Sequence, residues 1–149
     1  MALILLWLNF NDTLFEADPA SRYFTHLSRD NANLSPEIEN GEDAYDQKKY
    51  KRAYTLLLEE VAEGSDSLNL IYASVAAIGS QQAEKAIPIL APLVNTESWR
   101  LYQSEIQWYL ALAYLQEGEK EKAKEILQIM IDLKGEYSKN AQELMEQIK

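Results

Sequence analysis

The chain has 149 residues, of which 47% are apolar and 26% are charged, a composition typical of a folded globular protein rather than a disordered one. The formal net charge of −10 argues against a nucleic-acid-binding protein, because contacts to phosphates need a basic face. The absence of cysteine excludes disulfides and cysteine-ligated metal sites, and a single histidine excludes a histidine-rich one.

The amino end, residues 1–10, is strongly apolar but short. Seven apolar residues follow Met1, whereas a helix that crosses a bilayer needs about 20. No basic stretch precedes them and no small-residue cleavage site follows, so the segment is a poor signal peptide. Two interpretations stay open. We favour a strip that packs on the rest of a cytoplasmic protein; the alternative is the end of a membrane anchor, in a membrane-associated protein.

The next segment carries a helix start signal. Asp18 followed by Pro19 predicts a helix that runs to about Arg29, and three apolar residues share one of its faces: Tyr23, Phe24 and Leu27. We therefore expect two parts. Residues 1–33 form an N-terminal segment and helix that pack on a helical domain of residues 34–149.

Ser35 and Pro36 repeat the start signal and predict a helix to about Asp46, followed by a turn at residues 47–49. A second helix is expected over residues 50–63, ended by Gly64. Its apolar side is formed by Ala53, Leu56, Leu57 and Val61.

Residues 65–67 predict the cap of a further helix, which carries apolar residues up to Gly79. The helix after it is expected to start near Glu84, so that Pro88 lies close to the first turn. Pro92 then predicts a bend or an early end, because an interior proline removes a backbone hydrogen bond.

Thr96 predicts the cap of a longer helix that runs to Glu117 and breaks at Gly118. Its partner is expected over residues 119–133, ended by Gly135. Ser138 is then expected to cap a last helix, whose apolar stripe consists of Ala141, Leu144, Met145 and Ile148.

A spacing recurs three times along these helices: a small residue, an alanine twelve positions later and a leucine four positions after that. Such spacing fits a hairpin of two helices whose backbones approach at the small residues. The interval between the alanines is 33 residues and then 37, and residues 99–102 are the natural place for the extra four. The triplets are Gly41, Ala53, Leu57; Ser74, Ala86, Leu90; and Ala111, Ala123, Leu127.

Residues 34–137 resemble the tetratricopeptide repeat family. The third repeat keeps that family's leucine, tyrosine, glycine and alanine as Leu110, Tyr114, Gly118 and Ala123, whereas the second is the most degenerate. The resemblance implies an all-α fold of antiparallel helix pairs, stacked as a short right-handed superhelix. An isolated pair does not bury its apolar face, so the copies must stack.

The resemblance also implies a concave groove, lined by the first helix of each pair, that holds a peptide or helix of a partner. None of the groove positions is basic or asparagine, so the chain departs from the members that grip a terminal carboxylate. We expect a groove that is half apolar and half acidic, formed by Ile38, Glu42, Tyr45, Asp46, Ile71, Val75, Ile78, Trp108, Leu112 and Leu115.

Trp99 and Tyr102, beside the extra residues, are further candidates for partner contact, and for Trp108 a place in the core is the alternative. No motif for nucleophilic catalysis or phosphate binding is present, and we expect neither an enzyme nor a cofactor or metal. The sequence thus predicts a non-enzymatic interaction module or scaffold, whose partner is a protein or peptide with a basic segment, or a second copy of the chain. The alternative is the soluble part of a membrane-anchored structural assembly.

Overall fold

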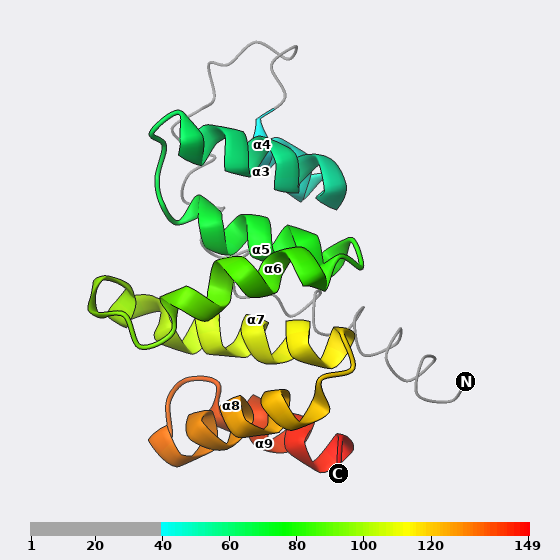
Figure 1. The fold of residues 1–149 in the computed structure, drawn as a ribbon, viewed down its shortest axis with the longest axis vertical. Coiled ribbons are helices and arrows are strands. Elements are labelled where there is room, and N and C mark those ends of the chain that lie inside the picture. The colour runs from blue at the N-terminus through cyan, green and yellow to red at the C-terminus, as the bar shows by residue number, and fades with distance from the viewer. Residues whose placement is uncertain (1–39) are drawn as a thin grey trace.

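The computed structural model describes residues 40–149, and this part of the chain is all-helical (Figure 1). The predicted segments at residues 1–33 and the candidate Ile38 lie outside the described residues. No strand occurs within residues 40–149. The elements are α3 (Gly41–Asp46), α4 (Tyr50–Ala62), α5 (Asn69–Gly79), α6 (Ala83–Leu90), η1 (Ala91–Leu93), η2 (Glu97–Tyr102), α7 (Gln103–Gln116), α8 (Lys120–Leu133) and α9 (Ser138–Gln147), where η marks a 3₁₀ helix.

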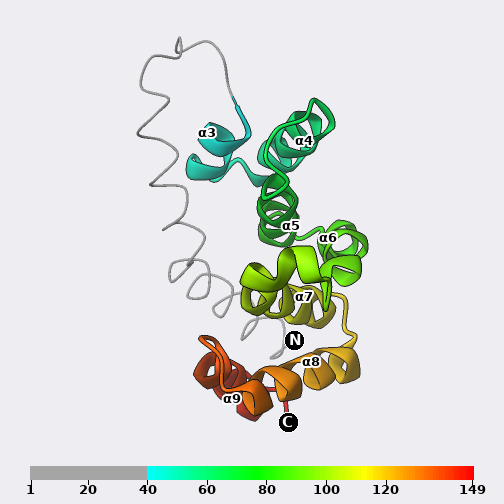
Figure 2. The same ribbon diagram turned by 90° about the vertical axis from the view of Figure 1, so that its left-hand side faces the viewer.

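Each α-helix packs against the next one along the chain, from α3 to α9. The helices form two layers: α3, α5, α7 and α9 lie in one, and α4, α6 and α8 lie in the other (Figure 2). Short connections between successive helices produce this alternation, since they return the chain antiparallel to the helix just completed. Helix α5 also packs against α7 within the first layer.

The residues of the repeated triplet lie in the core of the paired helices, as their spacing predicted. All nine of its residues are buried: the small residues Gly41, Ser74 and Ala111, the alanines Ala53, Ala86 and Ala123, and the leucines Leu57, Leu90 and Leu127. At Gly41 there is no room for a side chain. A Cβ atom placed there would lie 2.6 Å from the Cγ atom of Leu57.

Most predicted helix ends are confirmed, but the start of α3 is not. Helix α4 stops before Gly64, whose φ of +94° is a left-handed conformation that suits glycine, and Gly118 plays the same part after α7 with a φ of +76°. Helix α3 begins at Gly41 instead of Pro36. Asn40 caps it, because its side-chain oxygen accepts a hydrogen bond of 2.8 Å from the backbone N–H of Asp43.

The early end expected at Pro92 is confirmed. Thr96 precedes the next helical segment as expected, but that segment starts as a 3₁₀ helix and Thr96 makes no side-chain capping bond to it. Helix α6 tolerates Pro88 in its interior and ends at Leu90, and Pro92 lies in the 3₁₀ turn η1. The Thr96 hydroxyl donates back to the carbonyl oxygen of Pro92 at 2.9 Å instead of capping a helix. Residues 97–102 form η2, and α7 begins only at Gln103.

The side chain of Gln103 makes hydrogen bonds to the insertion, by which we mean residues 91–102, which form η1, η2 and the turn between them. Its Oε1 atom accepts a hydrogen bond of 2.9 Å from the backbone N–H of Asn95, and its Nε2 atom donates one of 2.8 Å to the carbonyl oxygen of Leu93. The side chain therefore pairs the backbone N–H of Asn95 and is a second donor to the carbonyl oxygen of Leu93, which also accepts from the backbone N–H of Thr96, so Gln103 links α7 to the segment before η2.

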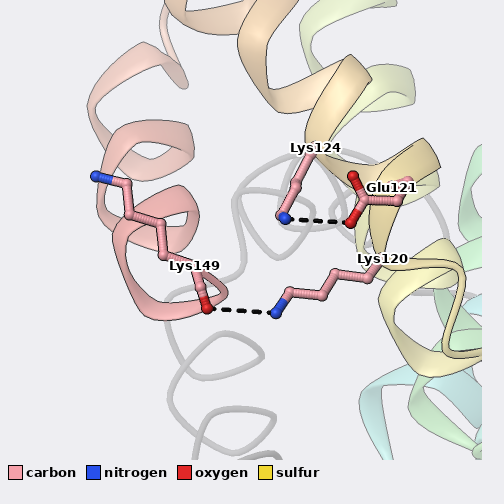
Figure 3. Close-up of polar contacts among 4 residues, drawn as sticks. All are labelled: Lys120, Glu121, Lys124 and Lys149. Atoms are coloured by element: carbon pink, nitrogen blue, oxygen red, sulfur yellow. Dashed lines mark hydrogen bonds and ion pairs between the residues drawn. The ribbon is translucent and has the colours of Figure 1, made fainter.

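Helix α8 ends at Leu133 as expected, but the residue that ends it is Lys134, whose φ of 52° is left-handed, rather than Gly135. Ser138 is the first residue of α9 and not its cap, since Tyr137 precedes the helix and makes no side-chain capping bond. Lys120, at the start of α8, donates to the backbone oxygen of Lys149, just beyond the end of α9, at 3.4 Å, and within α8 Lys124 pairs with Glu121 at 3.2 Å (Figure 3).

Candidate functional site

The predicted groove residues of α5 and α7 form two matching stripes. They recur at spacing i, i+4 and i+7, so that each set of three shares one face of its helix. Nearly all of this surface is closed to solvent: Ile71, Trp108 and Leu112 are about 5% exposed or less, and Val75 and Ile78 are completely buried. Only Leu115, near the end of α7, is half-buried. We call these six residues the shared face.

Helix α3 contributes the acidic end of the candidate site. Tyr45 is buried, with its ring edge-on to that of Tyr50 at a centroid distance of 5.5 Å, whereas Glu42 is half-buried and Asp46 is exposed. Helix α3 carries three acids and no base in its six residues. The face that α3, α5 and α7 present is therefore apolar along two helices and negatively charged at one end.

Glu42 is the most perturbed group in this acidic end. Burial, followed by the charges of Asp46, Asp43 and Glu60, raises its pKa from 4.5 to about 6. Its Oε1 atom is buried with no hydrogen-bond partner in the described part of the chain. Although most of the Asp46 residue is exposed, partial desolvation of its carboxyl, followed by the charge of Asp43, also raises the pKa of Asp46. Like charges crowded at a partly buried end make each further ionisation less favourable, which is why both pKa values are raised.

We expect the pH dependence of stability to report on Glu42. The folded state binds this proton more tightly than the unfolded state, so stability falls as pH rises through the window from 4.5 to about 6. After discounting for solvent screening, the loss is about 1 kcal/mol. Glu42→Gln should recover it at pH 7 and flatten the pH profile in urea denaturation. Glu59→Gln, at an exposed position of α4, is the matched control and should leave the profile sloped.

The 3₁₀ insertion places its aromatic residues at one end of the α7–α8 hairpin. Trp99 and Tyr102 are half-buried, with ring centroids 6.2 Å apart in an edge-on arrangement. Leu101 between them is 84% exposed, and Leu133 at the end of α8 is 68% exposed. The insertion is thus a separate surface from the shared face, because Trp108 lies in the buried stripe while Trp99 does not.

Two polar side chains that link neighbouring helix pairs by hydrogen bonds were not predicted from the sequence. Glu60 accepts hydrogen bonds from the backbone N–H of Gly41 at 2.8 Å and from the side chain of Asn69 at 3.0 Å, linking α3, α4 and α5. Gln116 accepts from the backbone N–H of Ala83 at 2.9 Å and donates to the carbonyl oxygen of Ile78 at 3.1 Å. Each holds the shared face in register, and no local motif marks either residue.

Residues 40–149 offer no group of three histidine, cysteine, aspartate or glutamate side chains that would hold a metal ion. Within the same residues, no helix has both the length and the apolar character that crossing a membrane requires. Comparison of the chain with protein-family models, with curated proteins and with solved structures gave no match.

Proposed function

We propose that the described helices form a tetratricopeptide-like right-handed superhelix of three pairs, α3–α4, α5–α6 and α7–α8, followed by α9. The observation that carries the proposal is the repeated triplet, because all nine of its residues are buried and each triplet spans one helix pair. The alternation of helices between two layers supports it as well (Figure 2). Units of this kind are stable only when stacked, and stacking creates an extended surface along the first helix of each pair.

In this proposal the protein is a non-enzymatic interaction module, and its binding surface is the side formed by α3, α5 and α7. An apolar centre with an acidic end suits an amphipathic helix or extended peptide that carries basic residues at one end. Five of the six residues of the shared face are buried, so the half-buried Leu115 supplies the apolar contact at its rim. The acids of α3 set the direction in which the partner lies and speed its approach.

The experiment that tests this proposal uses positions that a partner reaches without unfolding the protein. Asp46 is exposed and Leu115 is half-buried, so a photo-reactive amino acid at Leu115 samples the binding surface in the full chain. A second probe at Gln128, exposed on α8 in the opposite layer, is the positional control. We expect ultraviolet cross-linking in cells to give a discrete product at Leu115 and none at Gln128.

Reversing the charge of Asp46 tests whether the acidic end of the surface contributes to binding. Asp46→Lys should abolish the cross-link at Leu115, because it replaces an attraction by a repulsion. Glu59→Lys makes the same change of charge on α4 and should leave the cross-link intact. Equal cross-linked products at both probe positions, or a product that Asp46→Lys does not reduce, would contradict binding on this surface. A product that joins two copies of the chain would assign the surface to self-association.

A further inference from the structure

Three large apolar side chains in the described part of the chain are exposed, and all three lie at one end of the α7–α8 hairpin. Leu101 in η2 and Leu133 at the end of α8 are mostly exposed, and Ile129, one turn earlier in α8, is 48% exposed. Because α7 and α8 are antiparallel, the residues before α7 and the end of α8 lie at the same end of the stack (Figure 1). We call these three residues the hairpin patch.

The surroundings of Gly135 show that the two leucines belong to one surface. A Cβ atom placed on Gly135 would lie 3.5 Å from the Oγ atom of Ser104, in the first turn of α7. Leu101 comes three residues before Ser104, and side chains three residues apart share one side of a helical turn. Leu101 therefore lies on the side of α7 that faces the end of α8, and Leu133 is two residues before Gly135.

Comparison of the repeats shows that the helix does not require apolar residues at these positions. Ile129 and Leu133 come six and ten residues after the alanine of the third triplet. The same positions in the first repeat hold Glu59 and Glu63, and both are exposed. The third repeat thus places apolar side chains in solvent where the first repeat has charged ones. Exposed apolar side chains gathered at one place mark an interaction surface.

The hairpin patch is electrically neutral, although the chain has a net charge of −10. Residues 97–102 contain one acid and one base, Glu97 and Arg100, and residues 129–134 likewise contain Asp132 and Lys134. Glu97 and Arg100 pair with each other at 3.5 Å, but both side chains are mostly exposed, so this ion pair is weak and exchanges readily for another. Two copies of an acidic chain repel each other overall, and a neutral surface is where they approach with the least repulsion.

We propose that the hairpin patch is the contact between two copies of this chain, related by a two-fold axis. A two-fold contact sets one surface against itself, so the apolar side chains of the two copies pack together. Arg100 then faces Asp132 of the partner subunit, and Lys134 faces the partner's Glu97. An anionic membrane or a nucleic acid would need a basic surface, and a basic peptide would need an acidic one, whereas this patch is neutral. The contact is separate from the shared face, so it forms whether or not a partner binds there.

The small size of the patch sets the strength of the contact. Three exposed side chains from each copy bury less than the roughly 1,200 Å² at which stable protein interfaces begin. The half-buried Trp99 and Tyr102 beside them add only part of their rings. We therefore expect a reversible dimer with a dissociation constant on the order of tens of micromolar.

Sedimentation equilibrium of the full chain, at concentrations from about tenfold below to about tenfold above that constant, measures the dimer. Leu133→Glu introduces the residue type that the first repeat has at this position, and it should raise the dissociation constant at least about tenfold, because it places two charges in the apolar contact. Thr55→Glu adds the same charge at an exposed position of α4 and is the matched control, which should dimerise like the wild type. Unchanged circular dichroism and urea unfolding should show that both variants fold, since both positions are exposed.

A chain that is monomeric at every concentration, or a dimer that Leu133→Glu leaves intact, overturns the proposal. A monomeric chain that cosediments with phosphatidylcholine vesicles, and loses this binding in Leu133→Glu, also overturns it and assigns the patch to a lipid surface.

Exchange of two charges tests the two-fold arrangement itself. Arg100→Glu and Asp132→Lys should each raise the dissociation constant about fivefold, because each brings like charges together across the axis. The double variant should return to within about twofold of the wild type, because the exchanged charges attract each other again. A double variant that dimerises no better than the weaker single variant would show that Arg100 and Asp132 do not face each other, and it overturns the two-fold contact proposed here.

Discussion

Replacing Trp108 with alanine is expected to lower the free energy of unfolding by about 3–5 kcal/mol, the usual cost of removing a large aromatic side chain from a packed core. Trp108 is 4% exposed, and its ring stacks on that of Tyr137 with centroids 5.8 Å apart and planes inclined by 20°. Tyr137 leads into α9, so the stack fixes the last helix against α7. The free energy of unfolding of a domain is only about 5–15 kcal/mol in total, so this one substitution would remove a large part of it.

Urea and thermal unfolding of the full chain measure the effect, and Trp99→Ala is its matched control. Trp99 is half-buried in η2, and its truncation should cost about 1 kcal/mol, since less of its ring leaves an apolar environment. The melting temperature should therefore fall by more than about 10 °C for Trp108→Ala and by about 5 °C for Trp99→Ala. Similar small shifts for both would show that Trp108 is not part of the core.

Burial also decides where the proposed binding surface can be probed. Trp108 and Leu112 belong to the shared face, yet both are buried. A loss of binding after their truncation could therefore not be separated from a loss of folding. Asp46 is exposed, and replacing it changes charge without opening a cavity. Substitutions at the rim of the face, such as those at Asp46, therefore change the charge that a partner would meet and preserve the packing of the core.

Much of the helical architecture was predictable because its signals are local. Gly64 and Gly118 end helices through positive φ, and the residues at the twelve-and-four spacing are buried where two helices meet. Pro92 marked the end of α6 for the same kind of reason, since a missing N–H acts on its own turn. These features require no knowledge of what lies elsewhere in the chain.

Features that depend on distant partners were not predictable. Gln116 contacts residues 33 and 38 positions away, and a glutamine at the end of a helix is by itself unremarkable. The raised pKa of Glu42 likewise depends first on the burial that packing produces, and to a smaller extent on charges that include Glu60 on the next helix. Lys134 adopts a left-handed backbone beside a glycine that would take it at lower cost, so the residue type alone misleads.

The closure of the shared face is the clearest such case. Spacing placed three residues of α5 on one face, but exposure depends on what packs against that face. Ile71, Val75 and Ile78 match a groove lining and a core equally well by type, because both are apolar. Only the burial of the intervening residues as well, from Ile71 to Ile78, distinguishes a covered helix from an open one.

Gly41→Ala is expected to destabilise the protein by about 2 kcal/mol, although alanine is the better helix former by up to about 1 kcal/mol. The new methyl group would lie 2.6 Å from Cγ, 2.7 Å from Cδ2 and 3.0 Å from the backbone nitrogen of Leu57. Leu57 is 1% exposed, so its side chain has no free space, and a backbone atom does not move aside. Steric repulsion therefore outweighs helix propensity at this position.

A double-mutant cycle with Leu57→Ala isolates the contact. Leu57→Ala alone should cost about 2–5 kcal/mol through the cavity it leaves. In that background Gly41→Ala should lower the free energy of unfolding by much less than in the wild type, because most of the Leu57 atoms that it would clash with are absent. The expected coupling energy between the two sites is about 1–2 kcal/mol. Additive costs in chemical denaturation would mean that α3 and α4 do not approach at Gly41. The first triplet would then lack the close contact that makes it a repeat.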